Sequence, residues 1–132
     1  MDTIEGGTAD MTRPKVLVVE DEFIVAFDLA ETVRDEGFML AGPYAHGEEA
    51  LERLDNDHPD CAILDVKLAD GEVYSLADEL TERGIPILFH SGHEVPRDLL
   101  ARYPYAKACS KPCPPSELLD SLRDVVLEAR AA

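Results

Sequence analysis

Short runs of apolar residues recur along the chain at intervals of about twenty to twenty-five positions. They lie at residues 16–19, 38–41, 61–64 and 85–89, with a weaker run at residues 106–109. In the stronger runs the apolar residues follow one another without the alternation of a half-exposed strand. Each run therefore predicts a short strand that is buried on both faces.

Between the runs, apolar residues stand three or four positions apart, which is the spacing of one face of a helix. This spacing predicts helices over residues 22–36, 47–54, 73–80, 95–103 and 116–126. Gly37 and Gly84 are suited to end the first and third of these helices, because glycine readily takes the left-handed conformation found there. Gly42 and Pro43 are expected to break the second strand.

Five strands alternating with five helices predict an α/β fold, a five-stranded parallel sheet with helices on both faces. The length of 132 residues fits one domain, which we place at residues 14–130 after a disordered tail at residues 1–13. Ligands of open parallel sheets bind at the carboxyl ends of the strands. The residues at or just after those ends are therefore the candidates for a site: Glu20, Asp21, Asp65, Ser91 and Lys111.

Carboxylates end two of the predicted strands, with Glu20 and Asp21 after the first and Asp65 after the third. Each alone would commonly be solvated, but a parallel sheet brings them into one crevice. Carboxylates held close together raise one another's pKa values, and a bound divalent cation relieves this repulsion. Oxygen ligands with room for water suit magnesium. Magnesium beside a carboxylate is the arrangement that transfers a phosphoryl group to an aspartate, which Lys111 and Ser91 could then contact.

Three segments in this order resemble the receiver domain of bacterial response regulators: residues 15–22 (KVLVVEDE), residues 62–68 (AILDVKL) and Ser110-Lys111-Pro112. The resemblance implies a flavodoxin-like (βα)5 fold and a single-domain regulator in two-component signalling. It implies that a sensor histidine kinase or a histidine phosphotransfer protein phosphorylates Asp65. Phosphorylation would then switch the affinity of the chain for a protein partner.

The resemblance also assigns the remaining site residues. Mg²⁺ would be bound by the carboxylates of Glu20, Asp21 and Asp65 and by the backbone carbonyl of Lys67. Ser91 would be the switch hydroxyl, and Lys111 the lysine that contacts the phosphoryl group. Such a domain is not an enzyme with an external substrate, although receivers catalyse their own phosphorylation and dephosphorylation.

Three features depart from the receiver pattern. The loop after the acceptor, with Ala69 and Gly71, looks shortened, and Ala108 stands where an aromatic ring often swings inward on activation. Residues 89–92 (FHSG) partly resemble the Phe-x-Thr-Gly signature of the FAT GUY single-domain receivers. Without the ring, we expect activation to act through residues 89–105.

Charge and hydropathy exclude two classes of partner. Twelve Lys and Arg against 28 Asp and Glu give a net charge of −16, which repels nucleic-acid phosphates. The apolar runs are far shorter than the roughly 20 residues of a membrane span, and residues 1–13 lack the apolar core of a signal peptide. We therefore expect a cytoplasmic protein that binds neither nucleic acid nor membrane, as a monomer or weak homodimer.

Cysteines and histidines offer weaker signals. Cys61, Cys109 and Cys113 cannot all pair within one chain, and the last two are four positions apart, which is not the redox Cys-x-x-Cys spacing. We interpret them as core packing in a reducing compartment. His90 and His93 fall on a predicted strand-to-helix loop with few other ligands nearby, which disfavours a zinc site.

Two alternatives to a phosphorylated receiver are weaker. An aspartate-nucleophile phosphatase of the haloacid dehalogenase type needs Asp-x-Asp after its first strand. Here that strand ends in Glu20-Asp21-Glu22, and Asp65 is followed by Val66. A pseudo-receiver that folds without being phosphorylated is disfavoured because the set of acids, hydroxyl and lysine is complete.

Overall fold

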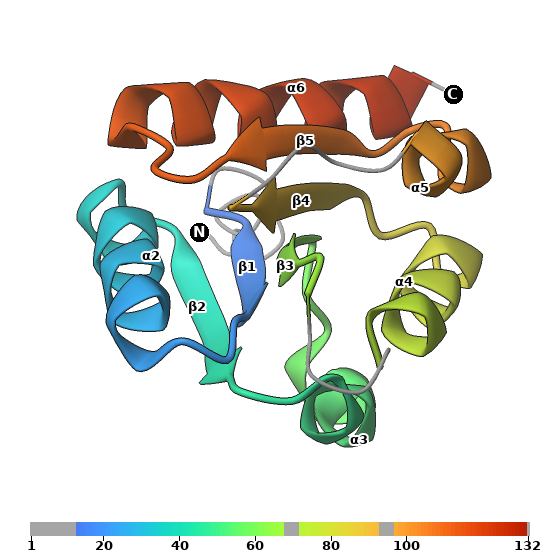
Figure 1. The fold of residues 1–132 in the computed structure, drawn as a ribbon, viewed down its shortest axis with the longest axis horizontal. Helices are drawn as coiled ribbons and strands as arrows, with labels where there is room; N and C mark the ends of the chain where they lie inside the picture. The colour runs from blue at the N-terminus through green and yellow to red at the C-terminus, as the bar shows by residue number, and fades with distance from the viewer. Residues whose placement is uncertain (1–12, 68–71, 93–96, 132) are drawn as a thin grey trace, which may run out of the picture.

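The computed structural model describes residues 13–67, 72–92 and 97–131, in which strands and helices alternate as predicted (Figure 1). The strands are β1 (Lys15–Val19), β2 (Met39–Tyr44), β3 (Cys61–Asp65), β4 (Ile87–Ser91) and β5 (Lys107–Ser110). The helices are α2 (Phe23–Asp35), α3 (Gly47–Asp57), α4 (Glu72–Glu82), α5 (Arg97–Arg102) and α6 (Pro115–Ala131). Residues 1–12 of the predicted tail lie outside the described residues, as do Ala69 and Gly71 of the loop predicted to be short.

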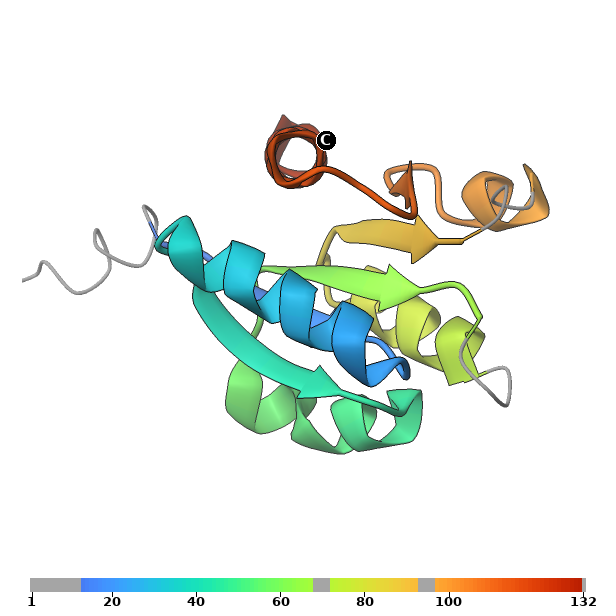
Figure 2. The ribbon, with the colours of Figure 1, turned by 60° about the vertical axis from the view of Figure 1, so that its left-hand side comes forward.

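All five strands are parallel and form one sheet in the order β2-β1-β3-β4-β5. Helices α2 and α6 cover one face of the sheet, and α3, α4 and α5 cover the other (Figures 1 and 2). The predicted flavodoxin-like fold is confirmed. The strand order changes direction at β1 and β3, so a crevice is expected at the carboxyl ends of these two strands.

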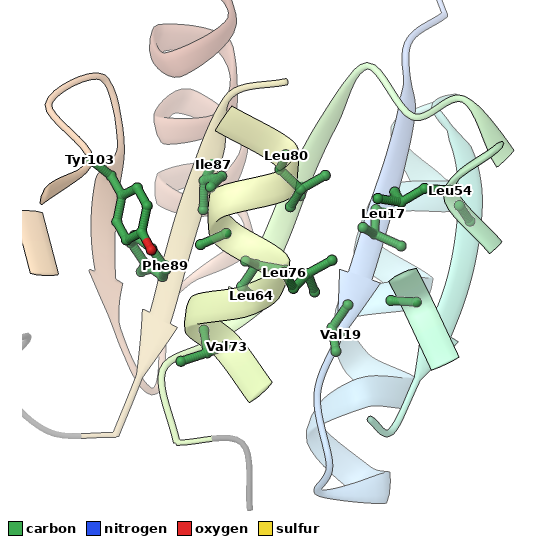
Figure 3. Packing of buried hydrophobic residues seen from close by; sticks show 14 of the residues in the cluster. Leu17, Val19, Leu54, Leu64, Val73, Leu76, Leu80, Ile87, Phe89 and Tyr103 are labelled. Atoms are coloured by element: carbon green, nitrogen blue, oxygen red, sulfur yellow. The ribbon is translucent and has the colours of Figure 1, made fainter. Parts of the chain in front are cut away.

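Alternate residues of the inner strands fill two separate cores. Leu17 and Phe89 pack against α3, α4 and α5 (Figure 3), whereas Val18 and Leu88 pack against α2 and α6. Full burial of one such side chain stabilises a fold by about 1.5–3 kcal/mol. The two-sided burial explains why these strands read as continuous apolar runs.

Two strands have predicted limits that are wrong by two residues or more. β2 continues through Gly42 and Pro43 to Tyr44, where the sequence predicted a break. Gly42 has a φ of +98°, and a Cβ at this position would lie 2.9 Å from the carbonyl oxygen of Val18. Glycine therefore allows the ladder with β1 to shift register without ending the strand. β4 begins at Ile87, two residues later than predicted.

The helices also differ from prediction at their ends. α3 and α6 continue past their predicted last residues. The prediction followed apolar residues on the buried face of each helix, so it missed the residues of the last turn that follow them. The short α5 is followed by Tyr103, whose ring centroid lies 5.8 Å from that of Phe89 and whose hydroxyl donates a 2.7 Å hydrogen bond to Asp78 of α4. Among the described residues, no helix has the length and apolar character of a membrane span.

Candidate functional site

The carboxyl ends of β1 and β3 lie side by side at the centre of the sheet. Their parallel register pairs Val19 with Leu64, so Glu20 and Asp65, which follow them, stand on neighbouring strands. Asp21 comes next in the chain, and the ligand atoms of Glu20, Asp21 and Asp65 all lie within 4.8 Å of one another. The structure thus brings together the three carboxylates that the sequence placed at strand ends.

A cleft of about 270 Å³ opens beside these carboxylates. It is lined by Asp21, Glu22, Asp65, Lys67, Gly92 and Lys111. Glu20 and Asp65 are only 2% and 4% exposed, whereas Asp21 is exposed. A small ligand would therefore meet Asp21 at the rim and Asp65 at the floor.

Lys111 follows β5 and reaches back over the carboxylates. Its Nζ lies 3.0 Å from Glu20 Oε1, 3.3 Å from Glu22 Oε1 and 3.7 Å from Asp65 Oδ2. Its backbone N–H donates a 2.6 Å hydrogen bond to the carbonyl of Ser91, the buried last residue of β4. The cation offsets the repulsion among the carboxylates and stands on the same side of the cleft as the end of β4.

The two buried carboxyl groups have opposite pKa shifts. Burial raises the pKa of Asp65 to about 6, and the neighbouring Glu20 adds to the rise. Burial would also raise the pKa of Glu20. Interactions with His90 and with Lys111, whose Nζ lies 3.0 Å from Glu20 Oε1, instead lower this pKa to about 2. Glu20 is therefore ionised at every physiological pH, and Asp65 is the carboxyl group whose charge responds to its surroundings.

The sequence model of the response regulator receiver domain matches residues 16–123, a range that includes all the candidate residues of the cleft. The chain belongs to this family. Receiver domains are phosphoacceptor regulatory domains of two-component systems. They accept phosphoryl groups from histidine kinases or phosphotransfer proteins and bind Mg²⁺ at an acidic pocket. The resemblance seen in the sequence is confirmed.

Individual relatives agree with this assignment. The chain is 34% identical over 127 residues to the transcriptional regulatory protein PdtaR of Mycobacterium tuberculosis, and the match covers 92% of this chain and 62% of PdtaR. The chain thus spans less than two thirds of that relative's length. The signal receiver domain of a modulated diguanylate cyclase from Desulfovibrio desulfuricans G20 has a TM-score of 0.78 at 25% identity, covering 90% of this chain and 98% of that one. A CheY-like receiver domain protein from Methanospirillum hungatei JF-1 shares the fold, with a TM-score of 0.77 at 21% identity and the same coverages of 90% and 98%.

The acidic cleft of this receiver domain fits a hard divalent cation. Its donors are carboxylate oxygens, and the exposed Asp21 leaves room for the waters that Mg²⁺ retains. The backbone N–H of Lys67 donates a 3.0 Å hydrogen bond to Asp65 Oδ1. This bond closes the turn from Asp65 to Lys67 at the end of β3.

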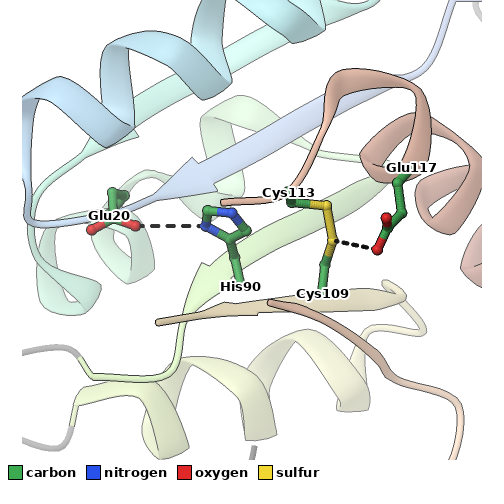
Figure 4. Close-up of a disulfide and its surroundings, with 5 residues drawn as sticks. All are labelled: Glu20, His90, Cys109, Cys113 and Glu117. Atoms are coloured by element: carbon green, nitrogen blue, oxygen red, sulfur yellow. Dashed lines mark hydrogen bonds and ion pairs between the residues drawn. A yellow bond between two sulfur atoms is a disulfide. The ribbon is translucent and has the colours of Figure 1, made fainter. Parts of the chain in front are cut away.

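The described residues include a second group of potential metal ligands, Cys109, Cys113 and Glu117. Its two sulfur atoms are joined in a disulfide, contrary to the interpretation of these cysteines as core packing alone (Figure 4). A disulfide offers no thiolate to a metal. The Cα atoms are 6.2 Å apart, because the chain turns back after β5, and a spacing rule based on Cys-x-x-Cys could not detect this. Cys61 is a free, buried thiol.

His90 is a neighbour of the site that the sequence did not predict, and its predicted place on a strand-to-helix loop is wrong. It lies in β4, directly opposite Asp65 in the register of β3 and β4, and is 4% exposed. Its Nδ1 lies 3.9 Å from Glu20 Oε1 (Figure 4). The sequence did offer one sign of this position, because His90 is a polar residue at the end of the apolar run that forms β4. His93 lies outside the described residues.

Proposed function

We propose that this receiver domain is phosphorylated on Asp65 in a Mg²⁺-dependent reaction, and that phosphorylation switches its affinity for a protein partner. The observation that carries the proposal is the buried Asp65 carboxyl group in an acidic cleft, with Lys111 Nζ 3.7 Å from its Oδ2. In this proposal, Mg²⁺ is bound by Glu20, Asp21, Asp65 and the backbone carbonyl of Lys67.

The side chains of the cleft divide the tasks of phosphoryl transfer. The Asp65 carboxylate attacks the phosphorus atom opposite the bond to the donor, so it reacts in its ionised form. Bound Mg²⁺ supplies positive charge that favours this ionised form and neutralises the phosphoryl oxygens. Lys111 contacts one phosphoryl oxygen through Nζ, and Ser91 donates its hydroxyl to another. Hydrolysis of the acyl phosphate returns Asp65 to its original state without turnover of an external substrate.

Phosphorylation by a small phosphodonor tests the assignment of Asp65. With acetyl phosphate and Mg²⁺, the wild-type chain should gain one phosphoryl group, labile at high pH, and Asp65→Asn should gain none. Asp120→Asn, which changes an exposed carboxylate on α6, is the matched control and should react like the wild type. Mass spectrometry measures both. A phosphoryl group that persists in Asp65→Asn would refute the assignment.

The donor, a histidine kinase or histidine phosphotransfer protein, docks in this proposal on the start of α2. Phe23, Ile24 and Phe27 are 81%, 73% and 55% exposed. Large apolar side chains gathered on a surface are typical of an interaction site. They come directly after Asp21 and Glu22, which line the cleft. A donor that covers this apolar turn would therefore hold its phosphohistidine next to Asp65.

The output that we propose is protein binding by a stand-alone, cytoplasmic regulator that is a monomer or weak homodimer. A net charge of −16 opposes direct binding to nucleic acid. PdtaR is named a transcriptional regulatory protein, but the match covers only 62% of its length, so its name does not assign a transcriptional role to this chain. The partial resemblance of residues 89–92 to the FAT GUY receivers supports a single-domain regulator.

A further inference from the structure

We propose that Cys109 and Cys113 form a thiol–disulfide exchange site that reacts with a dithiol and controls the position of Lys111. The inference rests on the proposed role of Lys111 in phosphoryl transfer. The disulfide links β5 to the loop before α6 across a separation of four residues, and Lys111 lies midway between the two cysteines. The covalent ring therefore contains the backbone of the lysine whose Nζ lies 3.0 Å from Glu20 and 3.7 Å from Asp65.

The two cysteines differ in their exposure to solvent. Cys109 is 3% exposed, whereas Cys113 is half-buried and lines a cavity of about 500 Å³ between α2 and the start of α6. Lys111 and Pro112 line the same cavity. Because exchange requires that a thiolate reach the sulfur it attacks, Cys113 is the point of entry.

Glu117 is positioned to favour the reduced state of Cys109. Its Oε2 lies 3.9 Å from Cys109 Sγ (Figure 4). A sulfur atom in a disulfide has no hydrogen to donate, whereas the thiol of reduced Cys109 can donate a hydrogen bond to this carboxylate.

Reduction takes place in two exchange steps. A thiolate of the dithiol attacks Cys113 Sγ, the bond to Cys109 breaks, and Cys109 leaves as a thiolate that takes up a proton. The second thiol of the reductant then attacks the mixed disulfide and releases Cys113 as a thiol. Two electrons and two protons pass from the dithiol to the protein, and the dithiol becomes a cyclic disulfide. Reoxidation by a low-molecular-weight disulfide reverses the exchange.

Reduction opens the ring around Lys111. The loop is then held by the hydrogen bond from the Lys111 N–H to the Ser91 carbonyl and by the ion pairs of Nζ, which constrain it less than a covalent bond. Phosphoryl transfer is sensitive to small displacements of the groups that position the reacting atoms. Disulfides in a reducing cytoplasm are usually transient and redox-sensing, which fits a switch.

The oxidised and reduced forms of the wild-type chain test this inference, with two cysteine variants as controls. Treatment with oxidised glutathione should remove two thiols, dithiothreitol should restore them, and peptide mapping should place the bond between Cys109 and Cys113. The oxidised form should be phosphorylated by acetyl phosphate about 3- to 10-fold faster than the reduced form. Cys113→Ser should behave as the reduced form under both conditions, and Cys61→Ala should keep the redox response. A disulfide that involves Cys61 would overturn the inference, and so would phosphorylation of both redox forms at the same measurable rate.

Hydrogen exchange at the Lys111 amide separates this inference from the proposed function. The amide donates to the Ser91 carbonyl at 2.6 Å, and its exchange should be faster in the reduced form. If neither form is phosphorylated but the disulfide and this exchange rate still respond, the proposed function fails and the exchange site stands. An amide that exchanges at the same rate in both forms would refute control of the Lys111 loop by the cysteines.

Discussion

Asp65 and Glu20 are two buried acids with opposite ionisation behaviour. Lys111 Nζ lies 3.0 Å from Glu20 and 3.7 Å from Asp65. Its positive charge therefore lowers the pKa of Glu20 more than the pKa of Asp65. The pKa of Asp65 is raised from 3.8 to about 6. A carboxyl group with a raised pKa binds its proton more tightly in the folded than in the unfolded chain. Its contribution therefore stabilises the fold at low pH and is lost as the pH rises from 3.8 through about 6.

Asp65→Asn should therefore stabilise the metal-free fold at pH 8 but not at pH 4. Asparagine resembles the neutral acid, so it removes the cost of a buried charge only where Asp65 is ionised. The difference between 3.8 and about 6 corresponds to roughly 3 kcal/mol as an upper limit. Since screening by nearby solvent reduces it, we expect about 1–2 kcal/mol. Urea unfolding in a chelator measures this at both pH values, with Asp120→Asn as the unchanged control. An equal effect at pH 4 and pH 8 would contradict the raised pKa.

Asp21 is the exposed member of the proposed Mg²⁺ site, and its removal separates metal binding from folding. Asp21→Ala should weaken Mg²⁺ binding by at least about 10-fold, because few protein ligands hold a cation that keeps most of its waters. The metal-free fold should be as stable as the wild type or slightly more stable, since one of three crowded carboxylates is gone. Calorimetric titration measures the affinity. Asp28→Ala, on α2 and outside the lining of the cleft, is the control. Equal affinities in wild type and Asp21→Ala would place the ion elsewhere.

At the scale of the element, substitutions at the start of α2 should affect a protein phosphodonor and a small-molecule phosphodonor differently. Phe23→Ala combined with Ile24→Ala should slow phosphorylation by a protein donor by about 10-fold or more, because exposed aromatic and aliphatic anchors dominate such contacts. Phosphorylation by acetyl phosphate needs no docking and should stay within about twofold. Stopped-time assays with both donors measure this. Leu127→Ala, which removes an apolar side chain that is 63% exposed on α6, is the control. Equal losses with both donors would contradict a docking role.

The order of the elements could be predicted because their signals are local. Buried parallel strands appear as continuous apolar runs, and their helices carry apolar spacing, so β1, β3 and β4 were found close to their true positions. The break predicted at Gly42 failed because pairing with β1 continues across it, and this pairing is a tertiary effect. The cleft could be predicted because strand order alone brings the ends of β1 and β3 together.

Contacts that depend on how the chain turns or on which face of a strand a residue occupies could not be predicted. The disulfide between Cys109 and Cys113 depends on the turn after β5, and the position of His90 beside Glu20 depends on which face of β4 it occupies. Neither is encoded in a short spacing pattern. The disulfide and His90 both lie within a few residues of the predicted site. At these positions the contacts depend on loop geometry, which a local sequence pattern does not specify.

The hypothesis that activation acts through residues 89–105 also belongs to this scale. Ala108 lies in β5 opposite Phe89, so β5 carries no ring at this position. An aromatic ring does lie against β4, but it belongs to Tyr103 after α5, and its hydroxyl is bonded to Asp78. Residues 93–96 lie outside the described residues, and the hypothesis stays a prediction. If it holds, movement of this segment must break or stretch the link between Tyr103 and α4.

At the scale of the whole molecule, positive charge is scarce, and part of it is already held in ion pairs. Twelve Lys and Arg stand against 28 Asp and Glu. Within the described part of the chain, the basic residues that form ion pairs with carboxylates are Arg34, Arg83, Arg102, Lys107, Lys111 and Arg123. Binding to a nucleic acid would have to break such pairs in addition to overcoming the net charge of −16.

The chain should therefore fail to bind duplex DNA at physiological salt, with or without the phosphate mimic beryllofluoride. One added phosphoryl group makes the charge more negative, so phosphorylation cannot supply the missing attraction. Electrophoretic shifts at about 25 mM and 150 mM salt measure this, because DNA binding that depends on phosphate contacts weakens steeply as salt rises. A known DNA-binding receiver protein run in parallel is the positive control. A specific shift at micromolar protein that weakens with salt would show that a basic surface forms despite the net charge. The output would then have to be sought in DNA binding, because affinity for a protein partner alone would not explain it.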